Sequence, residues 1–406
     1  MTRSKASTQR WQRGLIGLVV ACGLWTAPAV RAENGPSQFD IYGFAMLDMG
    51  YQTKQNDPAW FDVLRPTKLP SRDNQFGEDG RFFASVRQTR FGVKSTTPTD
   101  RGDLKTQFEW ELFGVGVDAG QTTIRLRHAY GELGQFGAGQ TWSPFMDIDV
   151  FPNSVEYWGP NGMAFFRNVQ VRWMPLKGES FATIALERPG ASGDAGLYSD
   201  RIQEQGIQGR FPLPDLSAEY RQAMPWGYIE GSGIVRQINW DDTNPAAPDL
   251  SGDTVGWGIH GSSNIKLEKA TARLSVLYGE GIENYLNDAP VDVAIDSIGP
   301  APDQLEGKAL PILGISAFVD IPWNEYWSST VGYSMVDIDN TNGQRPDAFK
   351  TGHYALGNLM YYPVKNVMAG FELQWGDRES KGGFTSDDVR IQFTAKYNFS
   401  KMFGGQ

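Results

Sequence analysis

Apolar and polar side chains alternate along most of the chain from Phe39 onward. In the segment VRIQFTAKYNF (389–399), every second residue from Val389 to Phe399 is apolar, and the residues between them are polar. A period of two is typical of a β-strand with one apolar and one polar face. The same pattern predicts strands at 39–51, 104–112, 124–130, 270–279, 312–321, 329–338, 353–362 and 367–376. Helix-type periodicity with capping residues is scarce, so the sequence predicts an all-β fold.

The connections between these segments alternate in length. Short connections are found at 97–103, 176–180, 224–227, 323–326 and 363–366, and long ones at 52–80, 190–214, 241–253 and 283–309. Transmembrane β-barrels have this layout, with short turns at one end and long loops at the other. Counting strands between the connections predicts a 16-stranded antiparallel transmembrane β-barrel with both termini at the short-turn end.

Two environments would suit the apolar faces of these strands. In a soluble β-sandwich they would pack in a protein core, whereas in a transmembrane barrel they would face lipid and the charged side chains would line the lumen. An export segment at the N-terminus and aromatic residues near strand ends favour lipid, because membrane barrels carry aromatic girdles at both interfaces. An acidic secreted sandwich without disulfides would also be unusual. The sequence therefore favours the barrel.

Residues 1–32 are typical of a secretory signal peptide, which leaves 33–406 as the barrel domain. The segment combines a basic start, an apolar stretch from Leu15 to Trp25 and a small-residue cleavage site at Val30–Ala32. The single cysteine, Cys22, lies inside it. If Cys22 were the processing site, it would be lipidated; if the cut follows Ala32, it is removed with the signal peptide.

The charge balance excludes a nucleic-acid binder. The whole chain has a formal net charge of −10, and the signal peptide carries basic but no acidic residues, so the mature chain is still more acidic. The 47 glycines and the aromatic content of 13% suit turns and aromatic-rich strands. No later stretch is apolar for long enough to predict a spanning helix.

Four stretches carry more specific features: FGVKSTTPTDRGDLKTQFEWE (91–111), RLRHAYGELG (125–134), AGQTWSPFMD (138–147) and YWGPNGMAFFRNVQVRW (157–173). In this order they resemble the DcaP-like family of trimeric outer-membrane porins. The resemblance implies a general-porin layout in which the connection after strand five, residues 147–166, folds inward as a constriction loop. It also implies a homotrimer in the outer membrane of a Gram-negative bacterium, with outer-membrane lipid and the barrel assembly machinery as partners.

The resemblance also implies basic residues on strands two, four and six, facing the constriction loop. The expected basic wall consists of Arg90, Lys94, Arg125, Arg127, Arg167 and Arg172. The acids of the loop are Asp147, Asp149 and Glu156, and strand three adds the lumen acids Glu109 and Glu111. Facing charges would produce a transverse field that orients charged solutes, although such arginines and glutamates could instead pair and stiffen the wall. The expected register puts Arg87 and His128 on the apolar face.

The sequence gives little indication of catalytic, metal-binding or sugar-binding sites. The three histidines are far apart in the sequence, and no zinc-protease or serine-hydrolase motif occurs. Residues 337–343 resemble a calcium loop but lack its glycine and glutamate spacing, so we interpret them as an ordinary outer loop. Trp142, Trp158 and Trp173 could stack a sugar, but tryptophans of a barrel usually belong to girdles or packing. We therefore expect no catalytic residue, cofactor or metal.

The sequence thus predicts a porin for passive diffusion of small hydrophilic solutes, with a preference for anions; the family resemblance adds dicarboxylates. One alternative is an outer-membrane barrel enzyme or adhesin that acts through its long outer loops. A second alternative is a soluble or lipidated periplasmic β-protein that binds sugar.

Overall fold

The computed structural model describes residues 35–198, 207–243, 249–299 and 304–404. Sixteen antiparallel wall strands can be followed within these ranges. They are β1 (Gln38–Gln52), β2 (Arg81–Ser85) continued by β3 (Arg90–Thr97), β4 (Leu104–Phe113), β5 (Thr122–Leu133), β6 (Phe136–Trp142), β7 (Arg167–Leu176), β8 (Phe181–Glu187), β10 (Ile207–Arg210) continued by β11 (Asp215–Met224), β12 (Gly227–Asp242), β13 (Gly252–Lys266), β14 (Thr271–Glu280), β17 (Pro311–Pro322), β18 (Trp327–Ile338), β19 (Phe349–Tyr361), β20 (Val367–Ser380) and β21 (Thr385–Phe403).

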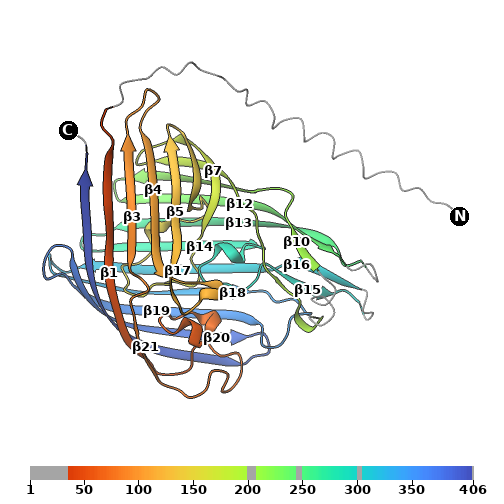
Figure 1. The fold of residues 1–406 in the computed structure, drawn as a ribbon. Helices are drawn as coiled ribbons and strands as arrows, with labels where there is room; N and C mark the ends of the chain where they lie inside the picture. The colour runs from red at the N-terminus through yellow and green to blue at the C-terminus, as the bar shows by residue number, and fades with distance from the viewer. Residues whose placement is uncertain (1–34, 199–206, 244–248, 300–303, 405–406) are drawn as a thin grey trace.

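The sheet closes on itself. Each wall strand pairs with the next along the chain, and β1 pairs with β21 from Phe39 opposite Phe403 to Gln52 opposite Arg390 (Figure 1). We count β2 and β3 as one wall strand because both pair with β1; β10 and β11 both pair with β12 in the same way. The predicted 16-stranded antiparallel barrel is confirmed, and the β-sandwich hypothesis is wrong.

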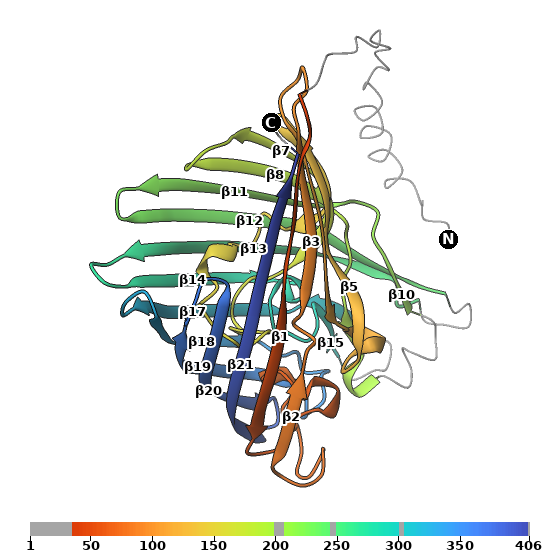
Figure 2. The same cartoon turned by 60° about the vertical axis from the view of Figure 1, so that its left-hand side comes forward.

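The two ends of the barrel differ as the connection lengths predict. Short turns join β3 to β4, β11 to β12 and β17 to β18, and β1 begins and β21 ends on the same side. The long connections at the other end carry a small sheet of β9 (Gly193–Asp194), β15 (Val293–Ser297) and β16 (Leu305–Ala309). Figure 2 shows the turns of β11–β12 and β13–β14 opposite the end where β10 and β15 lie. The 3-10 helices are η2 (Pro58–Trp60), η3 (Pro66–Lys68), η4 (Gly116–Asp118), η5 (Ile148–Val150), η6 (Gly196–Tyr198) and η7 (Glu283–Tyr285).

The apolar face of each wall strand points outward. On β21, the side chains from Val389 to Phe399 that alternation assigns to this face include five large ones that are 38–57% exposed. Arg390, Gln392 and Thr394, which lie between them, are 0% exposed. An outward apolar surface around a closed barrel suits lipid, since every backbone group of the sheet is already paired. Among the described residues, no helix is long and apolar enough to cross a membrane.

Parts of three long connections fold into the barrel. Residues 53–80 bury Leu64 and Leu69 against side chains of β17 and β19. Residues 143–166 join β6 to β7, and their Val155 N–H donates to Glu372 Oε2 on β20 at 3.1 Å. The third connection joins β14 to β17, and its Asn287 N–H donates to the Met163 carbonyl of the second connection at 2.9 Å. The inner space is therefore partly occupied by the chain itself.

Gly162 shows how closely the connection 143–166 approaches the opposite wall. A Cβ at this position would lie 1.9 Å from the Met335 carbonyl oxygen and 2.8 Å from the Ile315 N atom. The Gly162 N–H also donates to Ser334 Oγ at 2.9 Å. Only glycine fits so near to a backbone, and the connection therefore spans the barrel from β6 to β17 and β18.

The predicted signal peptide, residues 1–32, and Cys22 within it lie outside the described residues.

Candidate functional site

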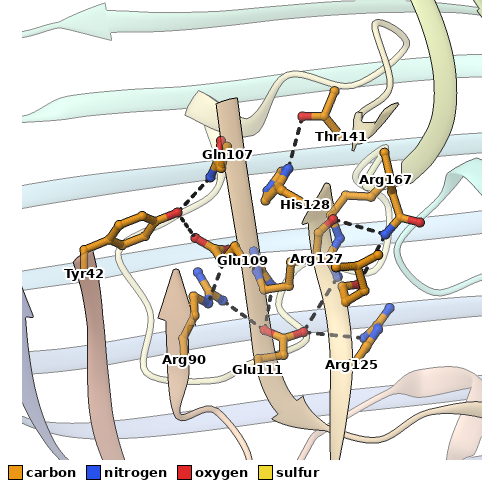
Figure 3. Close-up of polar contacts among 12 residues, drawn as sticks. Tyr42, Arg90, Gln107, Glu109, Glu111, Arg125, Arg127, His128, Thr141 and Arg167 are labelled. Carbon is orange, nitrogen blue, oxygen red and sulfur yellow. Dashed lines mark hydrogen bonds and ion pairs between the residues drawn. The ribbon is translucent and has the colours of Figure 1, made fainter. Parts of the chain in front are cut away.

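Arginine and glutamate side chains from four wall strands meet on the inner face of the barrel (Figure 3). Arg90 on β3, Glu109 and Glu111 on β4, Arg125 and Arg127 on β5, and Arg167 on β7 form this set, which we call the arginine cluster. The register brings them together, because β3 and β5 both pair with β4 and place Arg90 and Arg125 directly opposite Glu111.

Glu111 is the centre of the arginine cluster. Its carboxylate is fully buried and lies within 4 Å of four guanidinium groups: Arg127 at 2.7 Å, Arg90 at 3.2 Å, Arg167 at 3.7 Å and Arg125 at 3.9 Å. The Tyr157 hydroxyl, from the connection 143–166, also donates to it. One carboxylate thus anchors several cations, and removing it would leave them to repel one another.

Glu109 holds the other side of the arginine cluster. It pairs with Arg127 at 2.6 Å and accepts a hydrogen bond from the Tyr42 hydroxyl of β1 at 2.8 Å. Arg127 therefore bridges both glutamates, and its side chain is only 6% exposed. Its guanidinium carbon also lies 5.5 Å from the centre of the Trp142 ring, a distance suited to a cation–π contact.

The arginine cluster keeps an excess of positive charge. Four arginines face two glutamates, and the side chains of Arg90 and Arg125 remain 23% and 28% exposed. Arg125 has the loosest contacts, since its Nη1 is 3.9 Å from Glu111 and 3.4 Å from the Tyr157 hydroxyl. Its charge is therefore the one most available to a solute.

Two residues of the predicted basic wall lie on the inner face but outside the arginine cluster. The Lys94 ammonium is 4.8 Å from the centre of the Tyr42 ring. Arg172 donates to Gln170 Oε1 at 2.8 Å and to the Trp142 carbonyl at 2.5 Å. Neither residue forms an ion pair within the part of the chain that the structure describes.

The structure does not bring the loop acids to the arginine cluster. Asp147 accepts from Arg221 on β11 at 2.6 Å and from the Tyr228 hydroxyl on β12 at 2.6 Å, and Asp149 pairs with Arg221 at 2.5 Å. The base of the connection 143–166 is therefore fixed to another part of the wall. The acids that face the arginines are Glu109 and Glu111.

Glu156 is buried near the tip of this connection. Its carboxylate accepts the Leu64 N–H at 3.1 Å and the Gly159 N–H, and it has no ion pair within 4 Å in the described ranges. Burial raises the pKa of Glu156 to about 8. This side chain therefore links two inward connections and does not act as an exposed negative charge.

The expected outward positions of Arg87 and His128 are wrong. Arg87 pairs with Asp62 at 2.5 Å inside the barrel, and His128 Nδ1 is 3.1 Å from Thr141 Oγ1. The register of β2–β3 against β1 and of β5 against β4 shifts by one residue at these positions. Such a bulge puts two successive side chains on the same face.

Sequence reasoning also missed inner aromatic and basic residues. Tyr42 and Tyr157 donate hydrogen bonds to the two glutamates of the arginine cluster. The Arg65 guanidinium lies 4.2 Å and 4.0 Å from the ring centres of Trp60 and Trp158. A 2.8 Å ion pair joins Arg65 to an aspartate of the connection 281–310. Of the three tryptophans predicted as girdle or packing residues, Trp173 is on the outer face, whereas Trp142 and Trp158 contact arginines inside.

No group of three or more His, Cys, Asp or Glu side chains suited to a metal occurs in the described part of the chain.

Comparisons with known proteins agree with this architecture. A model of the DcaP outer membrane protein family matches residues 26–196. The outer-membrane channel DcaP of Acinetobacter baumannii has a TM-score of 0.75 and 21% identity, covering 89% of this chain and 97% of that one. An anion-selective porin from Comamonas acidovorans has a TM-score of 0.55 and 11% identity, covering 90% and 100%.

A trimer form of OmpT, an outer-membrane protein of Vibrio cholerae, has a TM-score of 0.53 and 13% identity, covering 89% of this chain and 99% of that one. A search of curated proteins gave no significant match. The family match covers the arginine cluster and the connection 143–166, and the structural matches cover the barrel. Residues 26–196 thus match the DcaP outer membrane protein family, and the barrel as a whole shares its fold with outer-membrane channels and porins.

Proposed function

We propose that this chain is an outer-membrane porin that favours small anions, dicarboxylates among them, and that the arginine cluster selects them. The observation that carries the proposal is the excess of arginine over glutamate on one inner wall, with Arg90 and Arg125 still partly exposed. A cationic wall inside a low-dielectric barrel raises the local concentration of anions. A guanidinium also offers a planar fork that fits a carboxylate.

The connection 143–166 is proposed as the constriction loop. Its Tyr157 reaches the arginine cluster, and its Val155 N–H and Gly162 N–H bond to side chains of β20 and β18. Solutes would then pass between this loop and the wall formed by β3 to β7. Charged groups act most strongly where the passage is narrow, because less water screens them.

We also propose a homotrimer. One solved barrel of similar fold is a trimer form. In this chain, the outer surface of β4 to β8 has an apolar hollow of 710 Å³ that includes the small residues Gly131 and Ala138. Small outward side chains permit close approach of another apolar surface. Size measurement of the detergent-solubilised protein by light scattering tests this assignment; a monomer would contradict it.

The function is tested by current through the purified protein in a planar bilayer with a KCl gradient. Anion preference predicts a reversal potential near the chloride equilibrium value, and succinate added to one side should reduce the current reversibly. Cation preference would overturn the role of the arginine cluster but leave a porin. Folded protein that gives no conductance steps would favour the alternative of an enzyme or adhesin that acts through its outer loops.

A further inference from the structure

A cavity of 300 Å³ lies on the long-loop side of the arginine cluster. It is lined by Arg125 and Leu126 of β5, by the connection 143–166, by the segment 283–289, and by single residues of β6, β7 and the connection 53–80. Its volume is at the lower end of the range for small-molecule sites, which is roughly 300–1,000 Å³. The cavity is thus large enough for a small organic solute.

Part of the lining of this cavity is cationic. Arg125 and Arg167 line it, and the Arg167 side chain is 5% exposed. Arg167 Nη1 is buried and has no hydrogen-bond partner among the described residues. A buried donor without a partner costs free energy that a ligand oxygen would recover. Arg65 also lines the cavity, but its charge is paired with Asp288 at 2.8 Å.

Another part of the lining is apolar. Phe165, Phe166, Leu286 and Ala289 line it, and both phenylalanines are only partly buried. Phe165 is held by Trp142, with ring centres 5.1 Å apart, and Phe166 packs on Tyr285 at 4.9 Å. The apolar surface is therefore fixed in place.

The cavity also reaches the edge of the barrel wall. β6 pairs with β5 only from Leu133 to Ala129, so residues 122–128 of β5 have no β6 partner. Gln140 Nε2 donates to the Leu126 and Arg127 carbonyls at 3.2 Å each, and Gln140 and Leu126 line the cavity. The lining therefore extends from the inward connections to the wall strands β5 and β6.

We infer that this cavity binds an anion with an apolar body, such as an alkyl monocarboxylate, with its carboxylate at Arg125 and Arg167 and its body on Phe165 and Phe166. The inference deepens the proposed function and rests on it, because the same arginines attract the anion. It adds a ligand class that differs from a hydrophilic dicarboxylate. Glu283 also lines the cavity, and burial raises its pKa well above its ordinary value, which weakens its repulsion of an anionic ligand.

The test measures the concentrations of acetate, hexanoate and succinate that halve the current through the porin in a planar bilayer. Hexanoate should block on the order of tenfold more tightly than acetate, since each additional buried methylene favours binding. F165A removes apolar surface, and A289L fills the cavity without removing existing contacts. Both variants should weaken the block by hexanoate and leave the block by succinate unchanged.

The control is A223L, which makes the same change on the inner face of β11, outside the cavity lining, and should alter neither block. Equal block by hexanoate and acetate, or hexanoate block unchanged in both F165A and A289L, would overturn the cavity site. If succinate block and anion preference persist in that case, the proposed function survives. Tight hexanoate block in a pore without anion preference would support the cavity site and overturn the proposed function.

Discussion

Replacing Arg125 with glutamine should reduce anion preference without unfolding the barrel. Arg125 is 28% exposed, and its only ion pair in the described residues is the 3.9 Å contact with Glu111. Its loss therefore leaves no carboxylate without a cation, because Glu111 keeps Arg127 at 2.7 Å and Arg90 at 3.2 Å. Such a loose pair contributes about 0–1 kcal/mol to stability.

The effect on selectivity follows from Coulomb's law. For a solute ion roughly 6 Å from the guanidinium in water, one unit charge is worth about 0.7 kcal/mol. Removing that charge acts in opposite directions on chloride and potassium, so the permeability ratio falls roughly fourfold when screening at about 0.1 M salt is included. At about 1 M salt the screening length is near 3 Å, and the same substitution should change the ratio by less than about 1.5-fold.

The assay is the reversal potential in KCl gradients at these two mean concentrations. Arg101 provides the matched control, because it lies in the exposed turn between β3 and β4 and R101Q makes the same charge change away from the inner wall. A folded barrel unfolds slowly and therefore migrates faster on a gel before heating than after it. The same behaviour of R125Q verifies its fold. If folded R125Q has the reversal potential of the parent protein at low salt, Arg125 does not face the solute path and the reasoning is refuted.

Three further substitutions or deletions test other parts of the site. R127Q should lower the temperature at which the barrel unfolds in detergent, since breaking a buried ion pair costs about 3–5 kcal/mol and leaves Glu109 and Glu111 with fewer cations; an unchanged transition would contradict this role. The pKa of Glu156 is raised to about 8, so its protonated carboxyl stabilises the attached loop. This stabilisation is fully present below the ordinary glutamate pKa and is lost as the pH rises through about 8. Current fluctuations should therefore increase between about pH 7 and about pH 9.5, and E156Q should abolish this increase. Equal pH dependence in the parent protein and E156Q would contradict the role of Glu156 in loop attachment. Deletion of residues 150–160 should raise the conductance, and unchanged conductance would show that these residues do not narrow the passage.

The two register errors had a signal in the sequence. In RLRHAYGE, polar side chains occupy Arg125 and Arg127 and then shift to His128, Tyr130 and Glu132. A change from odd to even polar positions within one strand marks a bulge, and the same change occurs between Arg87 and Gln88. Strict alternation was therefore the wrong assumption at these two places, although it was correct for β21.

The partners of the loop acids had no such signal. Asp147 and Asp149 stand in a connection without periodicity, and their partner Arg221 is more than 70 residues away. The same holds for Arg65, whose contacts come from three inward connections. Contacts between irregular segments depend on how the loops fold into the barrel, and the sequence pattern does not encode that path locally.

The sequence by itself determined the all-β class, the strand number, the outward apolar face and the wall strands that carry Arg90, Arg125 and Arg127. These properties follow from a period of two and from turn residues, which act over a few positions. The tertiary structure decided which charges neutralise one another: the register of β3 and β5 against β4 surrounds Glu111 with four arginines and leaves Arg125 the least engaged. Ion pairing depends on distances across strands and loops, and only the closed barrel fixes them.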